Sequence, residues 1–216
     1  MKNNTSYLFW DEIDNLTQIQ QHLMNHQLVV GTSDTVLGLL ANVTEAGFAE
    51  LNQLKARFDK PYIVLISGVD KLTHFTDQAI SSDVVNLLNF CWPGPLTMIF
   101  QARADLPPYM VSQDRKIALR VPQHAGLQAI LPAFAGLFST SANLTGQPVP
   151  GQIELLDPQI RQSVAATVLD RGQGGRANST QPSTILDCSS GRIRVVRAGA
   201  YAIESLERLC QESFQN

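Results

Sequence analysis

Short apolar, β-branched runs alternate with segments of helical periodicity along nearly the whole chain, and this alternation restricts the possible folds more than any other feature. Apolar residues recur at helical spacing over residues 13–23 and lead into the strand-like run 28–30. Strands separated by helical segments are typical of an α/β domain in which helices cover a sheet. We therefore predict a single domain over residues 1–216, with an open, twisted, mixed sheet and flanking helices.

The later elements follow from the same patterns together with their start and stop signals. Helices are predicted behind the candidate N-cap Thr44, over residues 84–90 and 124–134, and over residues 159–166 behind the start signal Asp157-Pro158. Strands are predicted over residues 62–67, 96–100, 117–121, 137–140, 167–170, 183–187 and 193–197.

The composition argues against several classes of protein. Sixteen Lys and Arg stand against nineteen Asp and Glu, so the overall charge does not require a nucleic acid or an anionic membrane as partner. No apolar run approaches the length that spans a bilayer, and we expect a cytoplasmic protein. Cys91, Cys188 and Cys210 are far apart and lack ligand spacing, so neither a disulfide framework nor a metal site of the protein's own is predicted.

Two hydroxyl-rich segments follow predicted strands, where open α/β sheets tend to place their ligand crevice. The turn 31–35 offers three hydroxyls and the carboxylate of Asp34, which suit a small ligand with an amine and a hydroxyl. The segment 139–146 offers hydroxyls, an amide and backbone donors for a nucleotide or an amino acid. Taken singly, each segment is better explained as an ordinary hydrogen-bonded turn.

Two further segments are cationic. Lys55, Arg57 and Lys60 lie close together at the end of a predicted helix and suit a polyphosphate, although helix-dipole compensation explains them about as well. Alternation along the strand that follows residue 115 places Lys116 and Arg120 on one face. Arg120 would there bind a substrate carboxylate or pair with an internal Asp or Glu, and both alternatives stay open.

Seven segments, taken in order, resemble the YrdC/TsaC family over about residues 15–200. They are TSDTVLGL (32–39), KARFDKP (55–61), WPGPLT (92–97), IALRVP (117–122), STSANLTGQP (139–148), PSTILD (182–187) and VRAG (196–199). Any one of them is a weak signal, whereas the ordered series is specific.

The resemblance implies an α/β fold around a positively charged concave cleft and an L-threonylcarbamoyladenylate synthase, a nucleotidyltransferase. Such an enzyme converts L-threonine, bicarbonate and ATP to threonylcarbamoyl-AMP and pyrophosphate for the t6A modification of tRNA, which makes tRNA and other t6A-pathway proteins candidate partners. The resemblance assigns threonine binding to Thr32, Thr35, Arg120, Ser141 and Ser183. It assigns ATP binding to Arg57, Lys60, Lys116, Ser139, Asn143 and Arg197. It assigns catalytic roles to Lys55 and Arg57.

Such a reaction depends on positioning and charge stabilisation more than on a protein nucleophile. The cations Lys55, Arg57 and Lys60, with Mg²⁺ as the expected companion of ATP, would stabilise the leaving pyrophosphate. The segment between Arg57 and Lys60 is one residue shorter than the family pattern, so the position of Lys60 relative to the phosphates is less secure than that of Arg57.

Two other interpretations compete with this one. A diverged paralogue would bind RNA or a nucleotide without making the adenylate, with phosphate contacts from residues 55–60 and 171–176. The sequence lacks the interleaved aromatic residues that would favour base stacking. A carbamoyl-transfer domain of a larger hydrogenase-maturation protein would share the fold but is disfavoured, since no zinc-finger or acylphosphatase-like segment accompanies it.

Overall fold

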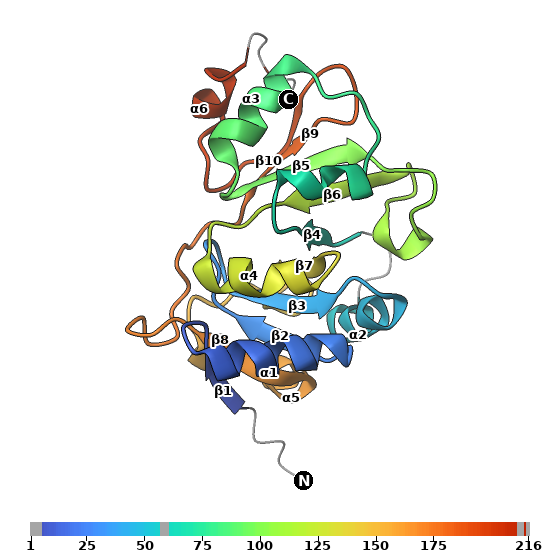
Figure 1. Ribbon diagram of the computed structural model, residues 1–216. Helices are drawn as coiled ribbons and strands as arrows, with labels where there is room; N and C mark the ends of the chain where they lie inside the picture. The colour runs from blue at the N-terminus through green and yellow to red at the C-terminus, as the bar shows by residue number, and fades with distance from the viewer. Residues whose placement is uncertain (1–5, 57–60, 211–213, 215–216) are drawn as a thin grey trace.

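A ten-stranded mixed sheet forms the centre of the molecule, with the strand order β1-β8-β2-β3-β7-β4-β6-β5-β9-β10 (Figure 1). The structure is a computed structural model that describes residues 6–56, 61–210 and 214. The strands are β1 (Ser6–Phe9), β2 (Leu28–Gly31), β3 (Gly38–Asn42), β4 (Ile63–Leu65), β5 (Leu96–Gln101), β6 (Lys116–Arg120), β7 (Leu137–Ser141), β8 (Val164–Leu169), β9 (Thr184–Asp187) and β10 (Arg194–Arg197). Parallel pairs such as β1/β8 and β4/β6 occur beside antiparallel pairs such as β3/β7, which confirms the predicted mixed sheet.

Helices cover the sheet from both sides. The α-helices are α1 (Ile13–Met24), α2 (Glu45–Lys55), α3 (Ser82–Cys91), α4 (Ala125–Ile130), α5 (Pro158–Ser163) and α6 (Ile203–Glu207). Short 3₁₀ turns are η1 (Val69–His74), η2 (Pro108–Met110), η3 (Leu131–Ala133) and η4 (Ile153–Leu155). Helices α1 and α4 pack against each other, as do α2 and α5 (Figure 1). No helix in the described part of the chain is long and apolar enough to cross a bilayer.

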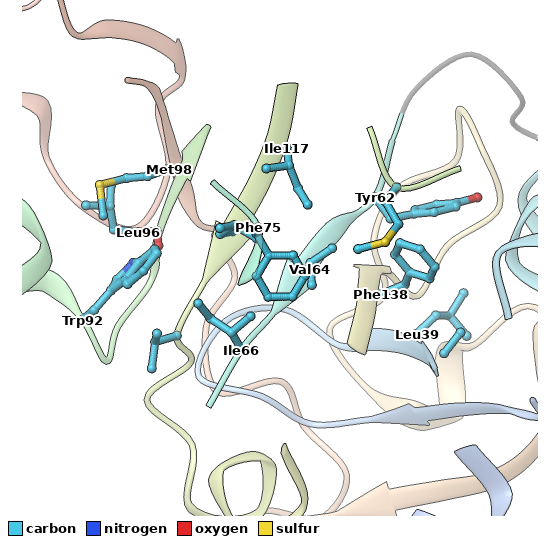
Figure 2. Packing of buried hydrophobic residues seen from close by; sticks show 14 of the residues in the cluster. Leu39, Tyr62, Val64, Ile66, Phe75, Trp92, Leu96, Met98, Ile117 and Phe138 are labelled. Atoms are coloured by element: carbon cyan, nitrogen blue, oxygen red, sulfur yellow. The ribbon is translucent and has the colours of Figure 1, made fainter. Parts of the chain in front are cut away.

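Strand alternation divides the buried residues between two apolar clusters. Val29 belongs to the cluster beneath α1 and α4, whereas its neighbours Leu28 and Val30 belong to the larger cluster that α2, α3 and α5 complete. The larger cluster includes the aromatic side chains of Tyr62 and Phe138, whose rings meet edge to face with 6.0 Å between centroids (Figure 2). Because successive side chains point to opposite faces of a strand, this division explains why β2 is apolar and buried along its whole length.

Local signals explain where the helices begin. Thr44 caps α2 by accepting a hydrogen bond from Gly47 N at 3.1 Å, and Asp157 caps α5 by accepting one from Gln159 N at 2.7 Å. Both helix starts were predicted from these residue types, which supply an acceptor for an amide without an intrahelical partner.

Several elements differ from the sequence prediction. The helix predicted over residues 159–166 ends at Ser163, because Val164 to Ala166 pair with β1 and β2 as the start of β8. The tertiary pairing of β8 between two buried strands therefore overrides the helical pattern. Strands β1 and β3 were not predicted at all.

Candidate active site

A cavity of about 640 Å³ opens on one face of the sheet. Its described lining residues alternate along the strands: Lys116, Ala118 and Arg120 come from β6, and Ile185 and Asp187 from β9. The predicted face of strand 117–121 is therefore the face that lines the cavity. Alternation brings side chains from strands far apart in the sequence into one concave surface.

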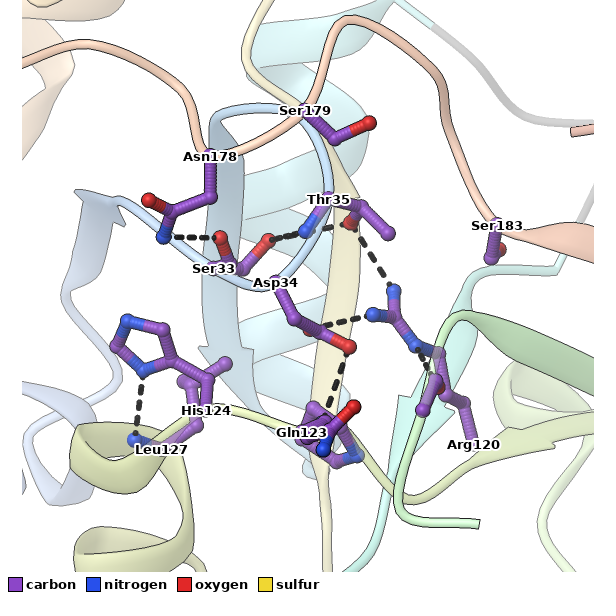
Figure 3. Close-up of polar contacts among 12 residues, drawn as sticks. Ser33, Asp34, Thr35, Arg120, Gln123, His124, Leu127, Asn178, Ser179 and Ser183 are labelled. Carbon is purple, nitrogen blue, oxygen red and sulfur yellow. Dashed lines mark hydrogen bonds and ion pairs between the residues drawn. The ribbon is translucent and has the colours of Figure 1, made fainter. Parts of the chain in front are cut away.

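The turn 32–35 between β2 and β3 forms one wall, and hydrogen bonds hold it in place (Figure 3). Ser33 Oγ accepts a hydrogen bond from Thr35 N at 3.1 Å and donates one to Val36 O at 3.0 Å. Asn178 Nδ2 donates to Ser33 O at 2.7 Å, and Ser179 N donates to Thr35 O at 3.2 Å. The turn is thus fixed both by its own side chains and by the loop that precedes β9.

Arg120 lies beneath this turn and is almost fully buried (Figure 3). Its Nε donates to Gly94 O at 3.0 Å, its Nη1 donates to Thr35 Oγ1 at 3.1 Å, and its Nη2 lies 2.5 Å from Asp34 Oδ1 as an ion pair without hydrogen-bond geometry. Burial lowers the pKa of Arg120, and the nearby Asp34 carboxylate opposes this decrease. The internal partner that the sequence left open is therefore Asp34, while the guanidinium still borders the cavity.

Lys55 joins the end of α2 to the segment 141–143. Its ammonium donates to Ser141 O at 2.9 Å, to Asn143 Oδ1 at 3.1 Å and to Asn143 O. The Ser141 hydroxyl donates to Asn143 Oδ1 at 2.6 Å, and Thr145 Oγ1 donates back to Lys55 O. The buried lysine therefore positions the segment that brings Ser139 and Ser141 to the cavity.

Asp187 organises the cations at the β9–β10 end of the cavity. Its carboxylate accepts hydrogen bonds from Lys116 Nζ at 3.0 Å and from Arg194 Nη2 at 2.8 Å. Burial raises its pKa, but the hydrogen bonds from Ser189, Lys116 and Arg194 prevail and lower it to about 2. The same contact with Asp187 raises the pKa of Lys116, which Asp114 also approaches at 3.2 Å. Lys116 and Arg194 thus share one carboxylate beside the cavity.

A β-bulge in β10 brings Arg197 to the same cavity. The register shifts between Val195 and Arg197, so Val196 is an extra residue and Arg194, Val196 and Arg197 all border the cavity. Arg197 donates to Ser183 O from Nε at 3.1 Å and from Nη2 at 2.7 Å. Burial is the larger cause that lowers the pKa of Arg197, and the positive charge of Arg120 lowers it further.

The structure brings most of the expected site residues together. Those that line the cavity are Thr35, Lys116, Arg120, Ser139, Ser141, Ser183 and Arg197. Lys55 and Asn143 support its wall. Thr32 is 1% exposed and its hydroxyl accepts a hydrogen bond from Trp10 instead. Arg57 and Lys60 lie outside the described residues.

Several residues of the site were not assigned from the sequence. Asp34, Asp114, Asp187 and Arg194 belong to its charged groups, and Asp34 and Asp187 stand within the quoted motifs. Because Asp34 neutralises Arg120 and Asp187 pairs with Lys116 and Arg194, the positive charge of the cleft stays a prediction. The described residues contain no group of three or more His, Cys, Asp or Glu that could hold a metal ion.

Comparison with known proteins places this site in context. Residues 21–199 match the Sua5/YciO/YrdC family model, which carries the description "Telomere recombination". A Threonylcarbamoyl-AMP synthase of Klebsiella pneumoniae subsp. pneumoniae is 31% identical over 175 residues, which cover 79% of this chain and 90% of that protein. A Threonylcarbamoyl-AMP synthase of Xanthomonas campestris pv. campestris is 35% identical over 152 residues, which cover 69% and 79%.

Solved structures share the fold. P. abyssi Sua5 complexed with L-threonine has a TM-score of 0.84 at 22% identity, and the match covers 98% of this chain but only 62% of that one. E. coli YciO has a TM-score of 0.79 at 18% identity, with 94% and 98% covered. The chain thus spans less than two thirds of P. abyssi Sua5 and nearly all of E. coli YciO. The match of a family model to residues 21–199, together with the two synthase relatives, shows that this chain belongs to the Sua5/YciO/YrdC family.

Proposed function

We propose that the chain is a threonylcarbamoyl-AMP synthase, a nucleotidyltransferase that converts L-threonine, bicarbonate and ATP to threonylcarbamoyl-AMP and pyrophosphate. Both similar bacterial relatives bear that name, and a related Sua5 fold has been solved with L-threonine. The product would serve the t6A modification of tRNA.

One observation carries the proposal: groups suited to an amino acid and groups suited to phosphates border a single cavity. Thr35, Arg120 and Ser183 supply two hydroxyls and a guanidinium on one side, while Lys116 and Arg197 supply cations next to them. In this proposal the threonine carboxylate lies near Arg120, whose guanidinium pairs with Asp34 and also borders the cavity. Threonine binding is assigned to Thr35, Arg120, Ser141 and Ser183, with Thr32 supporting the turn from behind.

The chemistry needs no protein nucleophile. The amine of threonine adds to bicarbonate and yields a carbamate and water. A carbamate oxygen then attacks the α-phosphorus of ATP in line, and the bond from that phosphorus to pyrophosphate breaks. Holding the two reactants in one cavity replaces an encounter in solution, and fixed cations stabilise the charge that develops on the leaving group.

The nucleotide is assigned to the cationic end of the cavity. Its proposed ligands are Lys116, Ser139, Asn143, Arg197, Arg57 and Lys60. Lys55 already bonds to the segment 141–143, so we assign it the positioning of that segment within the catalytic set, with Arg57 acting on the departing pyrophosphate. Mg²⁺ accompanies ATP as part of the substrate.

The direct test is pyrophosphate release from ATP with each amino acid in turn, with and without bicarbonate. The proposal expects release that depends on both threonine and bicarbonate. Arg57→Ala should lower turnover about 100-fold, as removal of one transition-state donor does elsewhere. The matched control is Arg103→Ala, because Arg103 is half-exposed and pairs with Asp105 at 2.9 Å, outside the cavity lining.

Other outcomes would refute the proposal in different ways. Release without threonine would point to another substrate. Binding of nucleotide or RNA without release under any condition would indicate the diverged paralogue, and an Arg57→Ala variant with full activity would remove the catalytic role of that residue.

A further inference from the structure

A polar network lies behind the turn 32–35, on the side away from the cavity. Trp10 Nε1 donates to Thr32 Oγ1 at 3.1 Å, and the Thr32 side chain helps to lower the pKa of Asp170. Asp170 also accepts from Asn178 Nδ2 at 3.1 Å, the same amide that donates to Ser33 O. Trp10 and Thr32 are 5% and 1% exposed, whereas Asp170 is half-buried and Asn178 is exposed, so the network runs from the interior to the surface.

His124 completes the network, and its surroundings fix its tautomer (Figure 3). Leu127 N donates to His124 Nδ1 at 3.3 Å at the start of α4, so this nitrogen carries no proton. The proton is therefore on Nε2, which donates to the carboxylate of Asp170 at 3.1 Å and 3.2 Å. One ring nitrogen thus caps a helix while the other orients the carboxylate behind the turn.

Trp10 is held by close packing as well as by its hydrogen bond. Its ring meets His124 edge to face, with 5.4 Å between ring centroids. A Cβ on Gly126 would lie 2.5 Å from Trp10 Cβ, and a Cβ on Gly31 would lie 3.0 Å from Trp10 Cζ2. The indole therefore fits between the base of the turn and α4, and it lies outside residues 21–199 that match the family model.

We propose that His124 and Trp10 are positioning residues for the amino-acid substrate, which act through Asp170 and Thr32 to hold the turn 32–35 in its binding geometry. This inference rests on the proposed function, because the substrate of the turn is taken to be threonine. Neither residue borders the cavity, so their effect reaches the substrate only through the turn. The nucleotide contacts lie on other strands and should not respond.

Two substitutions of His124 separate its two bonds. His124→Asn keeps an acceptor for Leu127 N but loses the donor to Asp170, whereas His124→Gln reaches Asp170 but loses the cap. We expect His124→Asn to raise the KM and the calorimetric Kd for threonine about tenfold, the usual effect of one hydrogen bond to a charged group. The KM for ATP should stay within about twofold, since no bond at the nucleotide end is lost.

His124→Gln and a control variant, Gln128→Ala, test whether a loss of stability alone explains a weaker binding of threonine. His124→Gln should restore the threonine KM towards the wild-type value even though its Tm falls. Gln128→Ala removes another hydrogen bond of α4, from Gln128 Nε2 to Pro122 O at 2.9 Å, and should leave the threonine KM unchanged. Thr32→Val should mimic His124→Asn, and Thr32→Ser, which keeps the hydroxyl, should not.

Three results would overturn the inference. One is an unchanged threonine Kd in both His124→Asn and Thr32→Val. Another is an equal rise of the KM for threonine and for ATP, because a general loss of structure would produce it. A wild-type protein without threonine-dependent pyrophosphate release would refute the proposed function itself, and the inference with it.

Discussion

Replacement of Lys55 by Met tests whether this lysine holds the segment 141–143 or acts on the phosphates directly. Lys55 is 4% exposed and, among the described residues, donates hydrogen bonds to Ser141 O, Asn143 O and Asn143 Oδ1. Hydrogen bonds that involve a charged group contribute about 1.5–3 kcal/mol each. The contributions of several bonds to one ammonium are not additive, and replacing the lysine also removes the free-energy cost of burying its charge. We therefore expect Lys55→Met to lower the free energy of unfolding by about 3 kcal/mol.

Urea unfolding measures this loss. With a slope of about 2.5 kcal/mol per molar urea, the midpoint should fall by about 1 M. In parallel, the KM for ATP and for threonine should both rise, because the segment 139–143 contributes to both parts of the cavity.

Lys71→Met is the matched control. Lys71 pairs with Asp70 at 3.5 Å and both side chains are solvent-exposed, so its loss should cost less than about 0.5 kcal/mol. The reasoning about Lys55 is refuted if Lys55→Met unfolds at the wild-type urea concentration while its kcat collapses, since that result assigns the lysine to the phosphates alone.

Two further predictions concern stability. Asp187→Asn should cost about 2 kcal/mol at neutral pH, because Arg194 and Lys116 lose their shared carboxylate. The pKa of Asp187 in the folded protein is about 2, below its ordinary value of 3.8. The stabilisation by Asp187 is therefore present above about pH 4 and is lost as the pH falls towards 2. The melting temperatures of the wild-type protein and the variant should converge at that low pH. Gly126→Ala should lower the free energy of unfolding, measured in urea, by about 1–3 kcal/mol, because the new Cβ would lie 2.5 Å from Trp10 Cβ. This loss opposes a gain in helix propensity of at most about 1 kcal/mol. An increase in stability would show that the indole can move aside.

Much of the element order was predictable because it depends on neighbours in the sequence. The cap at Thr44, the Asp157-Pro158 start and the alternation that places Lys116 beside Arg120 on one face are local properties, and the structure bears out all three. The family resemblance likewise followed from short motifs in order. These features need no knowledge of which strand lies beside which.

The errors occurred where distant pairing decides the outcome. Strand β8 begins at Val164 because it lies between β1 and β2 in the sheet, and the same residues read in isolation continue a helix. Helical and strand periodicities are hard to distinguish over so few residues, and burial between two partners resolves the ambiguity in favour of the strand.

The sequence by itself determined the class of fold, the family and several of the polar residues that border the cavity. The tertiary structure decided how those residues are used. Arg120 pairs with Asp34, Lys55 bonds across 86 residues to Ser141, and Thr32 faces Trp10 rather than the cavity. Each partnership joins segments that only the strand order brings together, and a buried polar group takes whichever partner the packed sheet places within reach.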